Sequence, residues 1–263
     1  MSSRYLSVVL PLFLIIAVGA SAAPLRICAD PDNLPFSNRA GQGFDNRIAV
    51  LVAHELDRPA EFIWARSRRG FLREQFNKGA CDLLMGVPQG MRALATSKSY
   101  YRSSYVFVTR RRDHLQIAGF DDPHLKGRRI GLQILEEDYA PPSLPLIRNG
   151  HAAQLVGFES FGARNADIVR AVADGRVGVA VVWGPLAGYV AGRDHLPVVL
   201  TSVSPRVDSS GVPFTYAMTI GVHKQDLALR DAVNEAVEKC RPQIRAILAR
   251  YHVPTVSDSE EAP

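Results

Sequence analysis

The sequence predicts an α/β fold in which strands and helices alternate along one chain of 263 residues. Short apolar runs of strand length alternate with segments whose apolar residues recur at helical spacing. One run, Val177–Val182, is wholly apolar and rich in β-branched residues, which is typical of a strand buried on both faces of a sheet. Because strands and helices follow one another in turn, the pattern implies parallel βαβ units.

Three strands and two helices are predicted before residue 90. Leu25–Ala29 is the first strand, and the following loop contains Pro31 and Pro35, which exclude a helix there. The next elements are a helix over Asn46–Leu56, a strand over Glu61–Ala65, a helix over Arg69–Lys78 and a strand over Asp82–Val87. Tyr105–Val108 is a further β-rich run.

The second half repeats this alternation. Strands are predicted at Arg128–Leu132, Gln154–Phe158, Val177–Val182, Pro197–Leu200 and Tyr216–Val222, and helices at Leu144–Asn149 and Asn165–Ala173. Asp226–Arg250 is a long amphipathic helix that Pro242 is placed to interrupt. The acidic, Ser-rich segment 257–263 is predicted to be disordered.

The N-terminus has the pattern of a secretory signal peptide over residues 1–22. Arg4 precedes the uncharged run Leu6–Ala17, and Ala20-Ser21-Ala22 supplies small residues for cleavage after Ala22. A membrane anchor is the alternative, but the run is shorter than the roughly 20 residues that a span requires. We therefore expect an exported, periplasmic protein with no stable membrane anchor.

The charge distribution argues against nucleic acid as a partner. The formal net charge is +5, and no long basic run marks a nucleic-acid-binding tail. Two short runs, Arg66–Arg69 and Arg110–Arg112, could dock on an acidic partner or form an ordinary solvated face.

Export places the three cysteines in an oxidising compartment. Cys28 and Cys81 each lie on or beside a predicted strand, and neighbouring strands are about 4.8 Å apart, within disulfide reach. We predict a Cys28–Cys81 disulfide; the alternative is that all three cysteines, with Cys240, are small buried side chains. No cysteine and histidine cluster has metal-ligand spacing, so no metal site is predicted.

No catalytic arrangement and no cofactor motif is evident. The seven histidines stand alone, and no Ser–His–Asp, Cys–His or paired-carboxylate pattern follows from spacing. Glu136-Glu137-Asp138 is acidic enough to bind a cation, but we expect it to supply charge to a helix N-terminus. The sequence therefore predicts a protein that is not an enzyme.

Six segments together carry a family resemblance: Cys28–Asn38, Cys81–Val108, Gly131–Pro142, Ala180–Tyr189, Pro213–Val222 and Tyr251–Pro254. Their order and spacing across residues 25 to 256 resemble type II periplasmic solute-binding proteins. Within that class they resemble the accessory proteins encoded beside PQQ-dependent methanol dehydrogenases and related quinoproteins.

The resemblance implies two doubly wound α/β lobes joined by two crossover segments. Lobe 1 would comprise residues 23–108 and, after the chain returns, 211–256; lobe 2 would comprise 109–210. The crossovers are expected near Val108–Arg111 and Ser204–Pro213.

Two departures from amino-acid-binding relatives are visible. Arg92 lies where those proteins offer an arginine to the ligand carboxylate, but the Thr before it is missing. Arg92 is either an anion clamp or a solvated surface residue. Trp183 stands where an Asp for the ligand ammonium group is expected, so no α-amino-acid site is evident.

In a doubly wound sheet, ligands bind outside the carboxyl ends of the strands. This rule selects a set of cleft residues: Asp30, Asp32, Asn33, Phe36, Arg92, Gln133, Asp138, Tyr139, Trp183 and Tyr189. Asp30 and Asp32 could accept hydrogen bonds from a ligand or cap their own loop. Trp183 could be a cleft wall or packing between lobes. A second set lies at the hinge or on a partner surface: Tyr100, Tyr101, Arg102 and Tyr105.

The resemblance implies a non-catalytic periplasmic accessory factor, without a cofactor, for a PQQ-dependent alcohol dehydrogenase. It would act in maturation or activation of that enzyme through protein contact. The alternative function is the solute-binding component of an ABC transporter for a small polar ligand, working by hinge closure. A binding-protein-derived dehydratase would require a general acid in the cleft, and none is evident.

Overall fold

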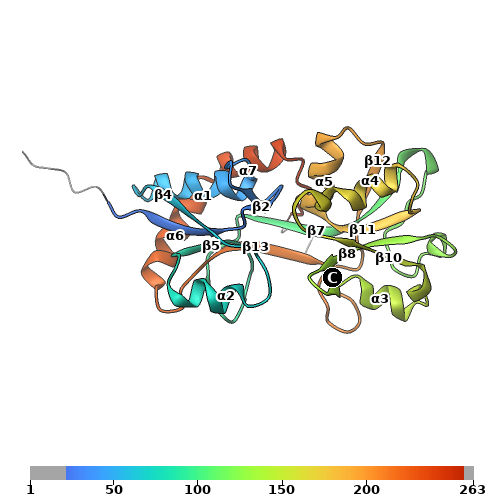
Figure 1. Ribbon diagram of the computed structural model, residues 1–263, viewed down its shortest axis with the longest axis horizontal. Helices are drawn as coiled ribbons and strands as arrows, with labels where there is room; N and C mark the ends of the chain where they lie inside the picture. The colour runs from blue at the N-terminus through green and yellow to red at the C-terminus, as the bar shows by residue number, and fades with distance from the viewer. Residues whose placement is uncertain (1–21, 258–263) are drawn as a thin grey trace, which may run out of the picture.

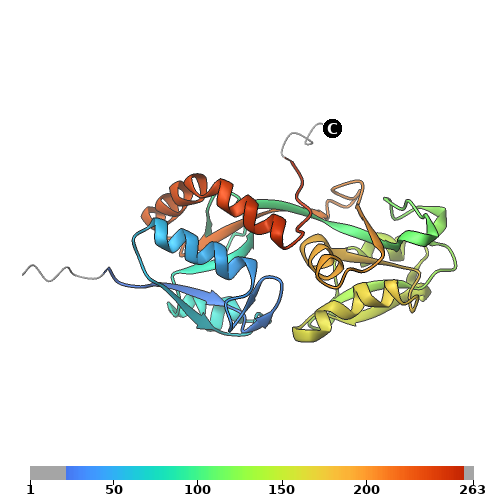
Figure 2. The ribbon, with the colours of Figure 1, turned by 90° about the horizontal axis from the view of Figure 1, so that it is seen from above.

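The structure is a computed structural model that describes residues 22–257, and this part forms two α/β lobes joined by two long strands (Figures 1 and 2). The predicted signal peptide, apart from Ala22, and residues 258–263 of the predicted tail lie outside the described residues. Within residues 22–257 no helix is long and apolar enough to cross a bilayer.

Lobe 1 is built on three parallel strands and one antiparallel strand. The strand order is β5–β1–β4 on one side, with β13 pairing antiparallel to β5. Its strands are β1 (Leu25–Ala29), β4 (Ala60–Trp64), β5 (Leu83–Pro88) and β13 (Thr215–Val222), with the short β6 (Ala95–Thr96) beside β13. Helices α1 (Phe44–Glu55), α6 (Leu227–Lys239) and α7 (Arg241–Arg250) pack together on this lobe (Figure 2).

Lobe 2 repeats the same architecture. Its parallel strands run in the order β10–β8–β11, and β7 lies antiparallel to β11 with β12 on its other edge. The elements are β8 (Ile130–Leu135), β9 (Asp138–Tyr139), β10 (Leu155–Glu159), β11 (Val179–Trp183) and β12 (Val198–Ser202), with helices α3 (Ser143–Arg148), α4 (Asp167–Ala173) and α5 (Gly184–Arg193). β11 is buried on both faces, as its apolar run predicts.

The first crossover lies inside one strand, β7 (Tyr101–Arg110). Residues Tyr101–Ser104 pair with β13, and from Tyr105 onward the strand pairs with β11. The chain therefore enters lobe 2 at Ser104–Tyr105, before the predicted Val108–Arg111. This position could not be predicted from the sequence, because an extended strand can change its pairing partner without any break in its own residue pattern. The return segment lies between β12 and β13, which includes Ser204–Pro213.

The core of lobe 1 follows from the helical spacing of α1. Phe44, Ile48 and Val52 lie on one face of the helix and are fully buried against β1 and the helices α6 and α7. Burial of each such side chain contributes about 1.5–3 kcal/mol. Lobe 2 has two further clusters, one on each face of its sheet.

Of three helical segments compared with the prediction, one is confirmed and two differ. The long C-terminal helix breaks at Cys240, and Pro242 lies in the first turn of α7, as predicted. The segment predicted as one helix over Arg69–Lys78 is instead α2 (Phe71–Glu74) followed by a 3-10 turn. Helix α5 was not predicted, because it contains several glycines and glycine has a low helix propensity. At Gly188 a Cβ atom would lie 2.0 Å from the carbonyl oxygen of His252, so glycine lets the C-terminal segment pack on the helix.

The disulfide between Cys28 and Cys81 is present. Cys28 is on β1, Cys81 precedes the neighbouring parallel strand β5, and their Cα atoms are 5.5 Å apart. Both residues are buried in a cluster with Phe71, Phe76 and Leu94. Cys240 is buried and free.

Candidate functional site

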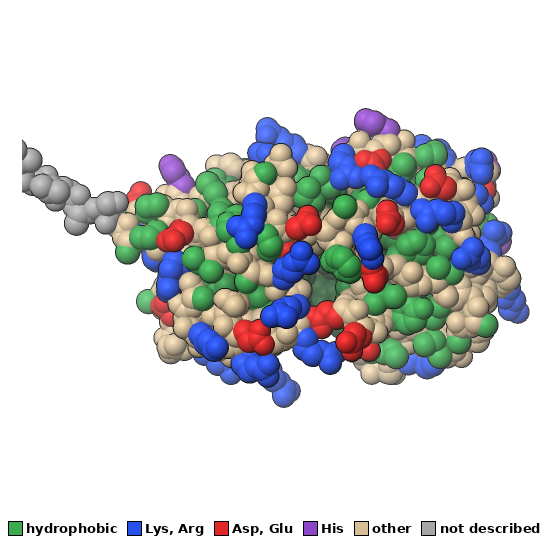
Figure 3. Space-filling view, in the orientation of Figure 1, with side chains coloured by type: hydrophobic (Ala, Val, Ile, Leu, Met, Phe, Trp, Pro, Cys, Tyr) green, Lys and Arg blue, Asp and Glu red, His purple; other side chains and the backbone are tan. Residues whose placement is uncertain are grey.

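A cleft of about 790 Å³ lies between the two lobes (Figure 3). Lobe 1 lines it with the loop after β1 and with the loop after β4, and lobe 2 lines it with β8, with Tyr105 of β7 and with the segment after β10. Six of the ten predicted cleft residues are among its lining residues: Asp30, Asp32, Asn33, Phe36, Gln133 and Trp183, the last at the end of β11.

Asp30 supports the loop after β1 with both carboxylate oxygens. Oδ1 accepts a hydrogen bond from the backbone N–H of Asp32 at 2.9 Å, and Oδ2 accepts one from the N–H of Ser67 at 2.6 Å. The first bond is an Asx-type turn, the capping role considered from the sequence. The second bond ties the loop after β1 to the loop after β4. Asp30 therefore shapes the lobe 1 wall of the cleft.

Asp32 and Asn33 form the short strand β2 (Asp32–Asn33), which pairs with β3 (Ser37–Asn38) and touches lobe 2. Across the cleft Gly162 has a φ of +55°, and a Cβ atom there would lie 2.7 Å from Oδ2 of Asp32. Glycine at this position satisfies both the backbone conformation and the close approach of the lobes.

A chain of polar side chains crosses the cleft. The Nε2 of Gln133, which is 4% exposed, donates to Oγ of Ser160 at 2.8 Å, and that hydroxyl donates to Oδ1 of Asn165 at 3.0 Å. The Nδ2 of Asn165 then donates to Oδ1 of Asn33 on lobe 1 at 3.2 Å. Gln133 also accepts from the backbone N–H of Trp183 at 2.7 Å. The closed arrangement of the lobes thus satisfies buried polar groups from both sides.

Trp183 is both a cleft wall and a packing residue. Its ring lies edge-on to Tyr105 and Tyr216, with centroids 5.3 and 5.8 Å away. It contacts the lobe 1 core and one of the lobe 2 cores. The two alternatives considered from the sequence therefore coincide in one side chain.

Four predicted cleft residues do not line this cleft. Arg92 is exposed in the turn after β5, and Asp138 and Tyr139 are exposed on β9. Tyr189 stacks on Tyr251 of lobe 1 with centroids 5.8 Å apart. The rule about the carboxyl ends of strands selected them, but β8 continues beyond Gln133 into a hairpin that carries Asp138 and Tyr139 away, and α5 turns Tyr189 toward the C-terminal segment.

The tyrosines predicted at the hinge are buried rather than on a partner surface. Tyr100, Tyr101 and Tyr105 are 3%, 5% and 7% exposed. Tyr105 lines the cleft, while Tyr100 and Tyr101 pack in the lobe 1 core. Arg102 is half-buried on β7, and its carbonyl accepts from Val256 of the C-terminal segment at 3.0 Å. These positions hold the hinge together.

Glu136-Glu137 forms the turn of the β8–β9 hairpin, so the predicted helix N-terminal role is wrong. Arg69 of lobe 1 reaches across to this hairpin, 3.5 Å from Oε2 of Glu136 and 3.3 Å from Oδ2 of Asp138. Figure 3 shows basic side chains on the lobe 1 rim of the hollow and acidic ones on the lobe 2 rim. The Arg66–Arg69 run thus contributes ion pairs between the lobes.

We expect Arg69→Ala to loosen lobe closure with little effect on stability. The side chains of Arg69 and Asp138 are 75% and 79% exposed, so the pairs contribute less than about 1 kcal/mol to folding. Small-angle scattering at low salt should report a larger radius of gyration for the variant than for the wild type, with the difference vanishing at high salt. Arg73→Ala, whose arginine pairs with Glu74 inside lobe 1, is the control. An identical scattering curve for Arg69→Ala would contradict this expectation.

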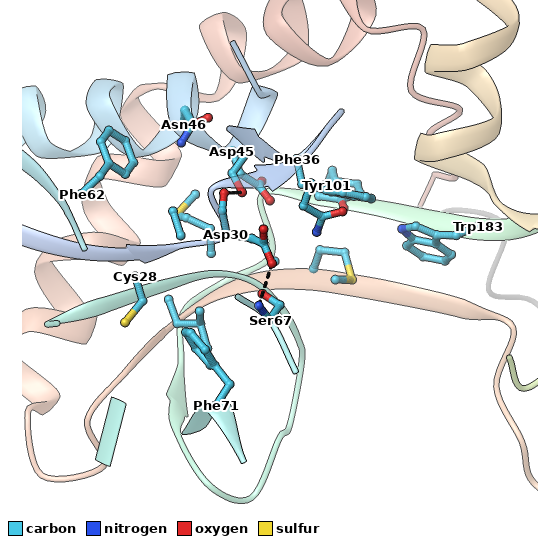
Figure 4. Close-up of a pocket in the computed structure, with 17 residues that line it drawn as sticks. Cys28, Asp30, Phe36, Asp45, Asn46, Phe62, Ser67, Phe71, Tyr101 and Trp183 are labelled. Carbon is cyan, nitrogen blue, oxygen red and sulfur yellow. Dashed lines mark hydrogen bonds between the residues drawn. The ribbon is translucent and has the colours of Figure 1, made fainter. Parts of the chain in front are cut away.

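A smaller inner chamber of about 310 Å³ lies in lobe 1 (Figure 4). It shares six lining residues with the cleft and is therefore continuous with it: Asp30, Asn33, Phe36, Ser67, Trp183 and Met218. Its remaining lining comes from the disulfide, α1 and neighbouring elements: Cys28, Ala29, Ser37, Asp45, Asn46, Phe62, Phe71, Leu84, Met85, Gly86 and Tyr101. Figure 4 shows Asp30 and Asp45 in the middle of this group.

Asp45 is the most perturbed carboxyl group in the chamber. It lies in the first turn of α1, is 6% exposed and accepts a hydrogen bond from the Tyr100 hydroxyl at 2.6 Å. Burial raises the pKa of Asp45 to about 7, against a smaller lowering by that hydrogen bond. Burial and the Asp45 charge in turn raise the pKa of Tyr100 well above its usual value.

Sequence reasoning missed Asp45 and several cleft residues. Asp45 follows Gly43 and Phe44 at a helix start, where an acidic residue is an ordinary feature. Other missed lining residues come from loops or from the return strand: Arg66, Ser67, Arg68, Ser160, Phe161, Tyr216 and Met218. Of these residues, only those in the Arg66–Arg69 run could be singled out from the sequence, because the run is a basic patch. Among residues 22–257 there is no group of three or more His, Cys, Asp or Glu side chains that could hold a metal ion.

The chain is similar to proteins called MoxJ. It is 32% identical to Protein MoxJ of Methylorubrum extorquens over 259 residues, covering 91% of this chain and 84% of the relative. The chain belongs to the MoxJ family. A second MoxJ, from Paracoccus denitrificans, is 28% identical over 256 residues and covers 91% of this chain and 92% of the relative. No family model matches the chain.

Solved structures agree with this MoxJ membership. MxaJ from Methlophaga aminisulfidivorans has a TM-score of 0.76 at 29% identity, covering 88% of this chain and all of that one. The periplasmic binding protein XoxJ from Methylobacterium extorquens has a TM-score of 0.73 at 30% identity, covering 89% and 100%. An ancestral cationic amino acid solute-binding protein, at 20% identity and a TM-score of 0.68, shares the fold. The predicted type II binding-protein fold is confirmed.

Proposed function

We propose that this protein is a non-catalytic periplasmic accessory factor that contacts a quinoprotein methanol dehydrogenase during its maturation or activation. Membership of the MoxJ family supports the proposal, because the resemblance seen in the sequence implies that partner. The signal-peptide pattern supports a periplasmic location.

The observation that carries the proposal is the altered amino-acid site. Arg92 is exposed in a turn outside the cleft, and Trp183 fills the position where an ammonium-binding Asp is expected, packed edge-on against Tyr105 and Tyr216. Without that Arg and Asp pair, the usual grip on both ends of an α-amino acid is missing. A cleft that has lost this grip favours a role in protein contact over amino-acid delivery.

Lobe 2 offers a surface for such a contact. Leu144 and Ile147, on one face of α3, are 49% and 47% exposed, and Figure 3 shows hydrophobic side chains gathered over this part of lobe 2. Phe161, at the mouth of the cleft, is 50% exposed, with Arg164 5.4 Å from its ring centre. Exposed large apolar side chains that lie together are typical of interaction sites.

We expect the purified chain to capture a PQQ-containing methanol dehydrogenase from the same cells, and the double variant Leu144→Ser/Ile147→Ser to weaken capture at least tenfold, or about 1.4 kcal/mol. Leu227→Ser is the matched control, because Leu227 is equally exposed (47%) but lies on α6 of lobe 1. Biolayer interferometry on immobilised dehydrogenase would measure each affinity. The proposal fails if the wild-type chain shows no affinity for the enzyme.

The alternative is a solute-binding protein of an ABC transporter. The cleft between two lobes favours it, and cross-lobe hydrogen bonds such as Asn165 to Asn33 resemble a closed state. A library of small polar solutes should then raise the melting temperature of the purified chain. Stabilisation by an α-amino acid, with no capture of the dehydrogenase, would favour this alternative.

A further inference from the structure

The inner chamber has an unbalanced charge. Its lining contains two carboxyl groups, Asp30 and Asp45, and none of the described residues that line it is Lys, Arg or His. Asp30 is occupied by two backbone N–H groups. Asp45 receives only the neutral hydroxyl of Tyr100 on Oδ1, and its Oδ2 faces Gly86, where a Cβ atom would lie 3.2 Å away. An ionised Asp45 therefore lacks a cationic partner inside the protein.

Two further polar groups in the chamber are unsatisfied. The Nδ2 of Asn46 and the hydroxyl of Tyr101 are buried without a hydrogen-bond partner, and the two residues are only 2% and 5% exposed. Asn46 uses its Oδ1 to accept from the N–H groups of Asn38 and Gly43, which leaves only the donor free. Burial raises the pKa of the Tyr101 hydroxyl well above its usual value; the nearby Trp183 indole opposes this rise but is not in hydrogen-bonding geometry with the hydroxyl. Because buried polar groups are normally paired, these two indicate a ligand.

The walls suit an organic cation. Phe36, Phe62, Phe71, Tyr101 and Trp183 surround the carboxyl groups with aromatic rings. Aromatic faces attract ammonium groups, and more strongly when water is excluded. An anion would meet Asp30 and Asp45 with no compensating positive charge, so the chamber selects against it. The volume, about 310 Å³, is at the lower end for ligand pockets and restricts the ligand to a small molecule.

We propose that the inner chamber binds a small organic ammonium compound that also carries an uncharged hydrogen-bond acceptor, such as an amino alcohol. The ammonium group pairs with Asp45, and the hydroxyl oxygen of the ligand accepts from Nδ2 of Asn46. The Tyr101 hydroxyl bonds to either group. The ligand enters through the cleft, since the two cavities share Asp30, Phe36 and Trp183.

Binding should depend on pH. The titratable groups that face Asp45 are the phenols of Tyr100 and Tyr101 and, across the chamber, Asp30. Burial raises the pKa of Asp45 to about 7 in the empty chamber, so the carboxyl group must lose a proton to pair with the cation. Below that pH we expect the affinity to fall by up to tenfold per pH unit, because the proton competes with the ammonium group.

Isothermal titration calorimetry of the full chain at pH 8 with four matched probes tests the proposal. The probes are 3-amino-1-propanol, propane-1,3-diol, n-butylamine and β-alanine, and the amino groups are protonated at this pH. We expect 3-amino-1-propanol to bind most tightly, n-butylamine about three- to tenfold more weakly, and β-alanine at least tenfold more weakly because of its carboxylate. The diol should give no measurable heat. No binding by either amine, or equal binding of the diol, overturns the proposal.

Substitutions of chamber residues test whether the ligand binds in the inner chamber. Asp45→Asn keeps the shape of the side chain and the Tyr100 hydrogen bond but removes the charge, so it should lower the affinity for 3-amino-1-propanol at least thirtyfold. Tyr101→Phe should lower this affinity three- to tenfold. Asp231→Asn, at an exposed carboxyl group on α6, should change nothing. Undiminished affinity in Asp45→Asn would contradict the proposal. Should Asp45→Asn fail to fold, the affinity of the wild type for 3-amino-1-propanol is compared at pH 6 and pH 8. Equal affinity at the two pH values would overturn the proposal. Capture of the dehydrogenase is measured on the same protein preparations, so that a failure of amine binding can be told apart from a failure of the proposed function.

Discussion

Replacing Cys28 and Cys81 together by serine is expected to lower the free energy of unfolding by about 4 kcal/mol. The disulfide closes a loop with a sequence separation of 53 residues, and constraining a loop of that length in the unfolded chain stabilises the folded state by roughly this amount. It also fixes β1 to the start of β5, and these two strands precede the loops that line the cleft and the inner chamber. Urea denaturation of wild type and double variant would measure the difference.

Reduction provides the control for the disulfide prediction. A reducing agent should destabilise the wild type to the level of the double variant and should leave the variant unchanged. Cys240→Ala under oxidising and reducing conditions should respond as the wild type does, because the buried Cys240 is free. Equal urea midpoints for wild type and double variant would show that the disulfide contributes nothing to stability.

The Asp45→Asn variant is expected to be more stable than the wild type at pH 8, by an amount on the order of 4 kcal/mol in the absence of ligand. The pKa of Asp45 is raised to about 7 in the folded protein from an ordinary 3.8, mainly by burial. The folded state therefore holds a proton that the unfolded chain has already lost between these two values. Stability contributed by this group is complete below about pH 4 and is lost as the pH rises through 7.

Stability measured against pH for both proteins would test the Asp45 prediction. The difference between variant and wild type should grow steadily from pH 4 to 7 and then level off, because all other titrating groups cancel in the subtraction. Asp231→Asn, at an exposed carboxyl group, should show a flat difference. A flat difference for Asp45→Asn as well would mean that the carboxyl group is solvated in solution.

Local patterns in the sequence predicted most of the elements. The run Val177–Val182 forms a strand buried on both faces, and Pro242 marks the break between α6 and α7. These predictions succeeded because they depend on the period of apolar residues and on the backbone limits of proline, which act within a few residues. Helix α5 was missed because glycine disfavours a helix locally, and the reason for its glycines is the close packing of His252, which is distant in the sequence.

The site was predicted less completely than the fold. Asp30, Asn33 and Gln133 line the cleft, because the carboxyl ends of parallel strands meet there. Arg92 and Tyr189 were placed there by the same rule but lie elsewhere, since a turn directs one to solvent and helix α5 directs the other toward Tyr251. The direction in which a loop carries a side chain depends on its neighbours in space.

By itself the sequence determined the alternation of strands and helices, the signal-peptide pattern, the resemblance to a binding-protein branch and the two cysteines able to pair. Only the tertiary structure decided that β7 serves both lobes, that Arg69 bridges them, and that Asp45, Asn46 and Tyr101 meet in one chamber. The physical reason is that periodicity records which face of an element is apolar. The charge balance of a cavity is the sum of side chains brought together from distant parts of the chain.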